Sequence, residues 1–347
     1  MAETKYRAAV IGCGGRCPAH VKAYERIENA EVVACCDLVA EKRDKRAEEF
    51  GIKAYGDAAE MLAAEKPDIV HITTQPTAHV DLMTTVSQGR VPLCTVEKPI
   101  ATGVRDWRSL CELEAKSGTK FAVCHQFRWH ENLVRCREAL ASGKLGEVKF
   151  LEFSAGMNIS GQGTHILNYG MSLNGDSPVA RVFGAAAGAS DTGGMHPAPK
   201  HTLGYLLFEN GVRAMWNNGP TAPVTGDPKT DYQHVRAAAH ADKGRVLWEE
   251  FGRWEIVGPD GRESGDCGDT DTVRASNQAA QAAFHNAMFT WLGDDAKPAG
   301  TNLAQSLHEW KVVLALYAGA LWRRPVELAD FDPPEDLFEQ LLEALAD

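Results

Sequence analysis

The 347-residue sequence lacks any apolar run approaching the roughly 20 residues that a membrane-spanning helix needs. Its first residues, Met1 to Arg7, carry mixed charge and lead directly into Ala8–Ile11, so they also lack the apolar core of a secretory signal. No cluster of Lys and Arg offsets the formal net charge of −11, which excludes nucleic acid as an expected partner. We therefore expect a cytoplasmic protein that binds neither membranes nor nucleic acid.

Cysteine is present, but not in a pattern typical of a disulfide framework or a metal site. The nine cysteines are odd in number and scattered, and the close pairs lie in apolar strand or loop segments. They are interpreted as reduced, mostly buried thiols. Internal repeats and low-complexity tracts are also absent. The length favours two domains, because it exceeds one ordinary globular core.

The first third of the chain alternates short apolar segments with helix-like segments, which is typical of βαβ units and a parallel sheet. The predicted core strands are Tyr6–Ile11, Ala30–Cys36, Asp68–Ile72, Pro92–Val96 and Lys120–Cys124. We expect residues 1–124 to form a dinucleotide-binding domain of the Rossmann type.

Residues 125–347 have a different pattern, in which longer alternating stretches are separated by turn residues. The segments 202–208 and 212–217 flank Glu209-Asn210-Gly211 and predict a hairpin. Residues 276–292 and 303–322 return to helical periodicity, and 333–346 fit a last amphipathic helix. We expect an α+β domain with a large, mostly antiparallel sheet.

A glycine-rich turn follows the first strand. In Gly12-Cys13-Gly14-Gly15-Arg16-Cys17 the glycines allow close approach of a pyrophosphate, although Cys17 replaces the third glycine of the usual fingerprint. Asp37 follows Gly14 by 23 residues, at the end of the next strand, where a carboxylate accepts hydrogen bonds from the ribose of NAD. Leu38 supplies no cation for a 2′-phosphate, so NAD is favoured over NADP. The alternative is a structural turn without a ligand.

Glu97-Lys98-Pro99 follows another predicted strand, at the edge where open α/β sheets bind ligands. A partly desolvated lysine there has a lowered pKa and can take the proton of a hydroxyl that is being oxidised. Considered alone, a lysine before a proline is more often a solvated loop residue.

Together these motifs resemble the glucose-fructose oxidoreductase / inositol dehydrogenase (Gfo/Idh/MocA) family. The segments that carry the resemblance are Gly12–Gly15 with His20, Thr73–Pro76 with His79, Glu97–Pro99, Ser142–Val148 and Arg324–Leu328. The resemblance implies a Rossmann domain that binds NAD(P), a sheet domain that presents a sugar site, and Lys98 in contact with the substrate hydroxyl and the nicotinamide ribose. The cofactor-binding residues that we expect are Gly12, Gly14, Gly15, Arg16, Asp37, Thr74, Pro76, His79, Glu97 and Lys98.

The family's third element, a helix beginning D-x-x-x-H-x-x-D, is altered in this sequence. His165 is present, but Gly161 and Asn168 stand where the two aspartates are expected. His165, Asn168 and Tyr169 have the spacing of one helix face, so all three can point into one pocket. His165 keeps an acid/base role in this interpretation, and the alternative is a capping or core histidine. The expected substrate-binding residues are Lys98, Arg128, His165, Asn168 and Tyr169, with a structural ion pair as the equal alternative for Arg128.

A second histidine pair, His196 and His201, does not favour a metal site. The prolines between them prevent a regular helix, so their spacing does not put both imidazoles on one face. We expect no metal and interpret the segment as a loop lining the substrate cleft.

The combined interpretation is an NAD-dependent oxidoreductase that acts on a CH–OH group of a sugar, polyol, cyclitol or sugar derivative, with Lys98 and His165 as catalytic residues. A homodimer or homotetramer through the C-terminal sheet is expected from the resemblance. Two alternatives stay open. One is an enzyme that cleaves glycosides by transient oxidation, elimination and re-reduction with a recycled cofactor; the other is a non-catalytic protein that binds a nucleotide or sugar.

Overall fold

The computed structural model describes residues 5–189, 197–223, 231–266 and 270–346. The chain forms two compact units. The first comprises residues 1–101, 108–126 and 277–307, and the second comprises 102–107, 127–276 and 308–347. A segment from the C-terminal half of the sequence is therefore part of the N-terminal unit.

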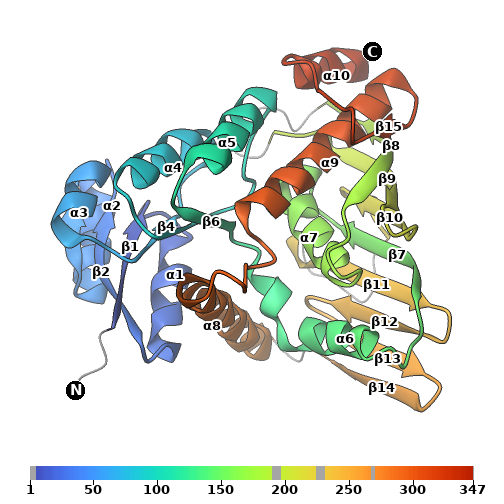
Figure 1. The fold of residues 1–347 in the computed structure, drawn as a ribbon, viewed down its shortest axis with the longest axis horizontal. Helices are drawn as coiled ribbons and strands as arrows, with labels where there is room; N and C mark the ends of the chain where they lie inside the picture. Colours follow the sequence, from blue (N-terminus) through green and yellow to red (C-terminus); the bar gives the residue numbers. More distant parts are fainter. Residues whose placement is uncertain (1–4, 190–196, 224–230, 267–269, 347) are drawn as a thin grey trace. The chain divides into compact units, whose positions relative to one another are not determined.

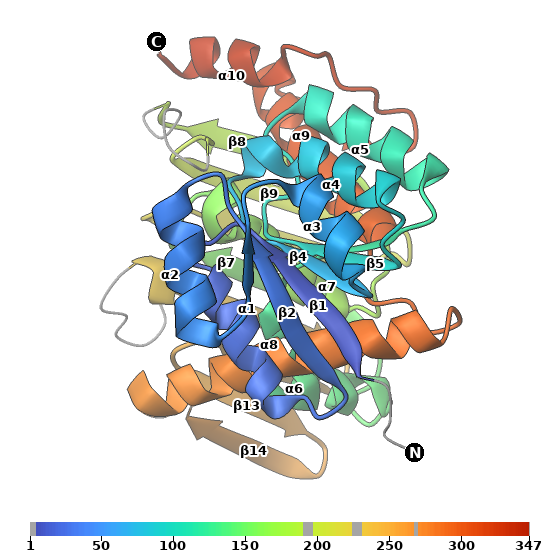
Figure 2. The same cartoon turned by 90° about the vertical axis from the view of Figure 1, so that its left-hand side faces the viewer.

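The first unit contains a six-stranded parallel sheet with the order β3-β2-β1-β4-β5-β6, which is the strand order of dinucleotide-binding folds (Figure 1). The strands are β1 (Tyr6–Ile11), β2 (Ala30–Cys36), β3 (Lys53–Tyr55), β4 (Ile69–Ile72), β5 (Leu93–Val96) and β6 (Lys120–Val123). Figure 2 shows β2, β1, β4 and β5 side by side. The predicted Rossmann sheet is confirmed.

Six helices have most or all of their residues in this unit. They are α1 (Cys17–Ala23), α2 (Ala40–Phe50), α3 (Ala58–Glu65), α4 (His79–Gln88), α5 (Val104–Lys116) and α8 (Thr270–Gly293). Helix α1 continues into a 3₁₀ turn at Tyr24–Arg26. Strands β1, β4 and β5 are almost fully buried, as expected for a parallel sheet covered on both faces.

The second unit contains a nine-stranded sheet with the order β14-β13-β12-β11-β7-β10-β9-β8-β15. The strands are β7 (Val148–Ala155), β8 (Val179–Ala187), β9 (His201–Phe208), β10 (Arg213–Asn218), β11 (Val235–Ala241), β12 (Gly244–Glu249), β13 (Arg253–Gly258), β14 (Gly261–Asp266) and β15 (Val326–Glu327). All neighbours are antiparallel except β7 and β10. The mostly antiparallel sheet is confirmed, and so is the β9–β10 hairpin, where Gly211 has a φ of +85°.

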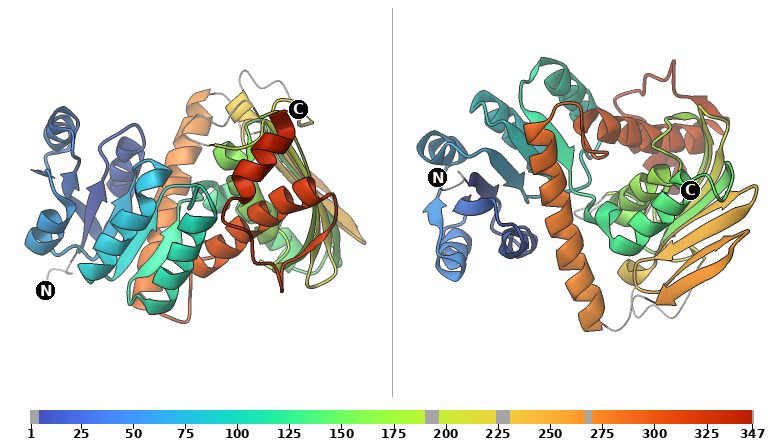
Figure 3. Two further views of the ribbon diagram at one scale, coloured as in Figure 1. Left: turned by 90° about the horizontal axis from the view of Figure 1, so that it is seen from above. Right: turned by 60° about the horizontal axis from the view of Figure 1, so that its bottom comes forward.

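Helices α6 (Glu131–Ala141), α7 (Thr164–Ser172) and α9 (Leu303–Trp322) cover one face of this sheet (Figures 1 and 3). Helix α9 comes very close to β8, since a Cβ at Gly184 would lie 2.0 Å from the carbonyl oxygen of Leu316. The last helix, α10 (Leu337–Ala346), buries Leu337 and Leu341. On the other face of the sheet, large apolar side chains of β8 and β9 are exposed: Phe183, Leu203 and Tyr205.

Within the described ranges, no helix combines the length and the apolar character that crossing a bilayer requires. The eight cysteines of these ranges are free thiols, and all but Cys111 are buried.

Candidate active site

The glycine turn lies between β1 and α1, and it packs against Thr73 and Thr74, which follow β4. Gly12 has a φ of +100°, and a Cβ there would lie 2.8 Å from the Thr74 side chain, so only glycine fits. The Thr73 hydroxyl donates to the Gly12 carbonyl oxygen over 2.6 Å. Gly14 and Gly15 face open space, with nothing within 4 Å of where a Cβ would be. The turn thus leaves room for a ligand to approach the backbone.

Asp37 follows the last residue of β2 and is fixed by two backbone donors. Its Oδ2 accepts the Cys13 N–H over 2.8 Å, and its Oδ1 accepts the Val39 N–H over 2.8 Å. A carboxylate so held beside a glycine turn is suited to bind ribose hydroxyls. Leu38, next in the chain, is 89% exposed and carries no charge. The Arg43 guanidinium lies 3.3 Å from the Asp37 carbonyl oxygen, a contact that the sequence did not predict.

Glu97 and Lys98 follow β5, and the peptide bond between Lys98 and Pro99 is cis. Glu97 is buried, and its Oε1 accepts from Arg16 Nε over 2.8 Å and from His20 Nε2 over 3.0 Å. Burial alone would raise the pKa of Glu97, but the charge of Arg16 and the hydrogen bond from His20 hold it well below its usual range. Glu97 is therefore a fixed negative charge next to Lys98.

Lys98 has the electrostatics expected of a general base. Burial lowers the pKa of Lys98 to about 8, although the neighbouring Glu97 carboxylate acts in the opposite direction. A lysine with this pKa is partly unprotonated near neutral pH, so it can accept a proton from a hydroxyl group. The sequence predicted a lowered pKa for this residue on the same physical ground.

The segment after β4 contains the other expected cofactor residues. Thr74 is partly exposed and packs against Gly12, whereas Pro76 is buried at the start of a 3₁₀ turn. His79 is completely buried at the start of α4, and burial lowers its pKa. Since no surface of its side chain is exposed, His79 lies beneath the backbone of Thr74 and Pro99 and supports these two loops.

In the second unit His165 and Tyr169 lie one turn apart on α7 and are in contact. The Tyr169 hydroxyl is 3.1 Å from His165 Nδ1, and the two rings are stacked with centroids 5.8 Å apart. Tyr169 is fully buried and packs edge-on against Trp248. The phenol therefore orients the imidazole, in the absence of the family's aspartates.

Asn168 takes part in a buried polar network. Its Nδ2 donates to Glu309 over 2.7 Å, and its Oδ1 accepts from Arg128 over 3.4 Å. Arg128 also forms an ion pair with Asp176. The structure therefore has the ion pair that the sequence left open for Arg128.

Gly161 lies in a π-helical turn at Ile159–Gly163, directly before α7. Its N–H donates to the Asn158 side-chain oxygen over 2.7 Å, and a Cβ at Gly161 would lie 3.0 Å from that oxygen. An amide, Asn158, is thus the side chain that caps this turn.

The sequence did not identify three buried polar residues that complete these arrangements. They are Gln281 and His285 on α8 and Glu309 on α9. A signal existed, because a Gln and a His at positions i and i+4 of a largely apolar helix predict a buried polar contact. His196 of the second histidine pair lies outside the described residues.

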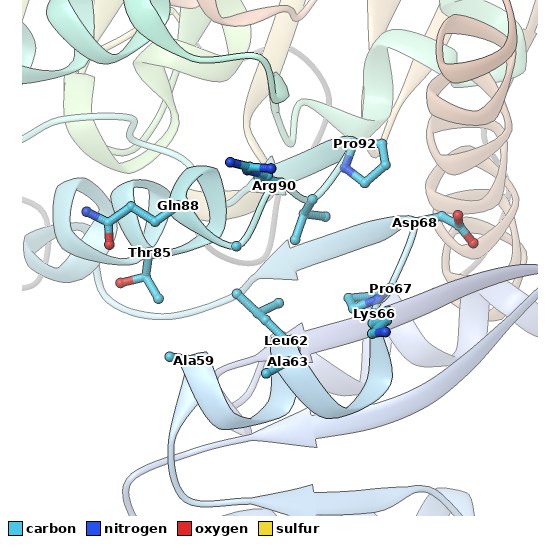
Figure 4. A pocket seen from close by; sticks show the side chains of 12 residues that line it. Ala59, Leu62, Ala63, Lys66, Pro67, Asp68, Thr85, Gln88, Arg90 and Pro92 are labelled. Atoms are coloured by element: carbon cyan, nitrogen blue, oxygen red, sulfur yellow. The ribbon is translucent and has the colours of Figure 1, made fainter.

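A pocket of about 610 Å³ in the first unit is not part of this arrangement (Figure 4). Figure 4 shows that its lining residues come from the ends of α3 and α4 and the starts of β4 and β5, including Leu62, Lys66, Asp68 and Arg90. That is the edge of the sheet opposite to Glu97 and Lys98, which follow the end of β5. Open α/β sheets bind ligands at the carboxyl ends of their strands.

The strand order and the glycine turn are those of a dinucleotide-binding Rossmann domain. Residues 6–125 match the family model GFO_IDH_MocA, described as "Oxidoreductase family, NAD-binding Rossmann fold". The resemblance to the Gfo/Idh/MocA family is thus confirmed for the nucleotide-binding domain.

Two curated relatives and one solved structure illustrate the similarity. D-apiose dehydrogenase from Paraburkholderia graminis is 31% identical over 208 residues, which cover 53% of this chain and 55% of the relative. Inositol 2-dehydrogenase from Salmonella typhimurium is 25% identical over 146 residues, which cover 41% and 43%. The chain thus spans about half the length of the curated relatives it matches.

The solved structure is an oxidoreductase from Agrobacterium radiobacter in complex with NAD+, L-tartaric acid and magnesium. It has a TM-score of 0.80 and 21% identity, and the match covers 94% of this chain and 99% of the other. The similarity therefore extends to the fold of both units.

Proposed function

We propose that the protein is an NAD-dependent oxidoreductase that acts on a CH–OH group of a sugar, polyol, cyclitol or sugar derivative. The observation that carries the proposal is Lys98, a lysine with a pKa of about 8, placed after β5 in the same unit as the glycine turn and Asp37. The relatives' names, an apiose and an inositol dehydrogenase, support the substrate class. A cytoplasmic location is part of the same proposal.

The residues present fit NAD. Gly14 and Gly15 leave the backbone open to a pyrophosphate, and Asp37 presents a fixed carboxylate to the adenosine ribose. The chemistry that the bound nicotinamide supplies is hydride acceptance. Lys98 accepts the proton of the substrate hydroxyl, and Glu97 stabilises the lysine when it becomes charged. His165, oriented by Tyr169, donates a hydrogen bond to a substrate oxygen.

The decisive experiment is a panel of sugars, polyols and cyclitols incubated with NAD while NADH absorbance and product are measured. Net NADH with an oxidised product supports the dehydrogenase. Release of an aglycone from a glycoside without net NADH supports elimination with a recycled cofactor. Nucleotide binding without either product supports a non-catalytic binding protein.

We expect NAD to bind more tightly than NADP. The fixed carboxylate of Asp37 would face a 2′-phosphate, and a repulsion of about 1.4 kcal/mol corresponds to a tenfold difference in affinity. Titration of the purified protein with both nucleotides measures the ratio of the NAD affinity to the NADP affinity. Asp37→Ser is expected to lower this ratio. Glu48→Gln, which removes an exposed charge from α2, is the control. A wild-type preference for NADP contradicts this assignment of Asp37.

Tyr169→Phe is expected to lower kcat about fivefold, the effect of one lost hydrogen bond of about 1 kcal/mol to His165. His165→Ala is expected to cost more than Tyr169→Phe but less than the loss of Lys98. Steady-state kinetics of both variants measure these effects, with Tyr205→Phe on the exposed sheet face as the control. A Tyr169→Phe enzyme with unchanged kcat and pH profile would show that the phenol does not orient the imidazole.

We further propose that the exposed face of the nine-stranded sheet pairs two copies of the chain. Phe183 and Tyr205 are cross-strand partners on β8 and β9, and are 46% and 40% exposed. Exposed apolar clusters of this kind mark protein interfaces. Tyr205→Lys is expected to shift the protein from dimer or tetramer to monomer in light scattering. A monomeric wild-type protein contradicts the proposal.

A further inference from the structure

A chain of buried side chains runs from α8 to the carboxylate next to Lys98. His285 Nε2 lies 3.3 Å from His20 Nδ1, and His20 Nε2 lies 3.0 Å from Glu97 Oε1. His20 and His285 are completely buried. His285, His20, Glu97 and Lys98 all belong to the first unit.

The ionised state of Glu97 fixes the proton on His20. A carboxylate can only accept, so His20 Nε2 must carry the hydrogen that is donated to Glu97. Burial lowers the pKa of His20, so the ring is neutral near pH 7 and its Nδ1 is an acceptor. The donor facing Nδ1 is His285 Nε2. The Gln281 amide nitrogen lies 3.1 Å from that nitrogen, and the amide oxygen lies 3.4 Å from Arg16 Nη2. Since His285 Nε2 cannot both donate to His20 and accept from Gln281, we assign the amide with its two ends exchanged, so that its oxygen accepts the His285 N–H.

The third histidine of this region cannot take the place of His285. His71 Nε2 is bonded to the Tyr24 hydroxyl and its Nδ1 to the Thr95 hydroxyl, each over 2.6 Å. The His71 ring lies flat against the His285 ring, with centroids 4.3 Å apart. Its nitrogens are therefore engaged elsewhere, and stacking keeps His285 in the orientation that reaches His20.

We propose that His285 is a positioning residue that acts through His20 on Glu97, and thereby sets the charge that Lys98 experiences. The proposal rests on the proposed role of Lys98. The titratable or charged groups that face His285, His20 and Glu97 are listed here: Arg16, Tyr24, His71, Lys98 and Cys124. Burial raises the pKa of Cys124 to about 12 and that of Tyr24 well above its usual value, so near pH 8 the changing charge is that of Lys98.

The consequence of losing His285 has a definite sign. Without its N–H the Nδ1 of His20 has no donor, and the tautomer that donates to Glu97 is then favoured by Glu97 alone. Glu97 stays ionised beside Arg16 but is less neutralised, so it favours the charged form of Lys98 more strongly. The limb of the pH–rate profile that reports Lys98 should then move upward.

The test compares His285→Phe with His285→Gln, whose amide can place an N–H where Nε2 was. For His285→Phe we expect the limb near pH 8 to rise by about one unit, and for His285→Gln a profile close to that of the wild type. Ring ¹⁵N shifts of His20, assigned with His20→Gln, give the tautomer without cofactor or turnover. We expect protonated Nε2 and unprotonated Nδ1 in the wild type and a mixture in His285→Phe.

The spectra separate this proposal from the proposed function, because they need no activity. If the protein lacks dehydrogenase activity but His20 changes tautomer in His285→Phe, the proposed function fails and the link to His20 stands. If His285→Phe lowers Tm while the His20 tautomer and the pH limb stay unchanged, His285 is merely structural and the proposal is wrong. Stoichiometric metal bound at the histidines in the purified protein would also overturn it.

Discussion

Lys98→Met is expected to lower kcat by about 10²- to 10⁴-fold while NAD still binds with near wild-type affinity. Methionine keeps the length of the side chain but cannot hold a proton, and the pyrophosphate is placed by the glycine turn instead of by Lys98. In the wild type the rate of alcohol oxidation should rise with pH up to about 8, where Lys98 loses its proton. That limb should be missing in Lys98→Met.

The matched control is Lys22→Met, which removes a half-exposed charge from α1 of the same unit. Stopped-flow kinetics give the hydride-transfer step, and nucleotide fluorescence titration gives the affinity. Near-normal kcat in Lys98→Met removes Lys98 from the mechanism. A large loss of NAD affinity with unchanged kcat would assign it to binding.

The parts of the candidate site that the sequence predicted are those built from local spacing. The turn at Gly12, the acid at Asp37 and the lysine at Lys98 each follow a buried strand directly, and the carboxyl ends of parallel strands meet at one edge of the sheet. Strand order could be anticipated for the same reason. Short βαβ connections have few topologies, and the observed order is the common one.

The contacts that the sequence did not predict join residues far apart in the chain. Asn168 has the right helical spacing to share a pocket with His165, yet its amide is bonded to Glu309, 141 residues later. Helical periodicity identifies a face but not the element packed against it. The same limit applies to His285, which is 265 residues from its partner His20. The sequence pattern also did not predict that residues 277–307 belong to the N-terminal unit.

The buried histidines of the first unit should make the protein sensitive to acid well above the range of carboxylate titration. Burial lowers the pKa of His71 and of His285 well below the usual value of 6.5. Below pH 6.5 the unfolded chain binds protons at these positions and the folded chain does not, so stability is present above pH 6.5 and is lost as the pH falls. These two groups together lower the free energy of unfolding by about 2.7 kcal/mol per pH unit, and the lowered pKa values of His20 and His79 add to this slope.

Urea unfolding at pH 7.5, 6.5 and 5.5 measures this slope. His71→Gln is expected to be less stable at pH 7.5, because its hydrogen bonds to Tyr24 and Thr95 are altered. Its slope below pH 6.5 should be shallower than that of the wild type by about 1.4 kcal/mol per pH unit, the share of one histidine. His240→Gln on the half-exposed sheet surface is the control and should keep the wild-type slope. A free energy of unfolding that stays constant from pH 7.5 to 5.5 would mean that the folded protein binds these protons as readily as the unfolded chain. The histidines could then not be neutral in the folded protein, and the donor that His20 presents to Glu97 would need a different origin.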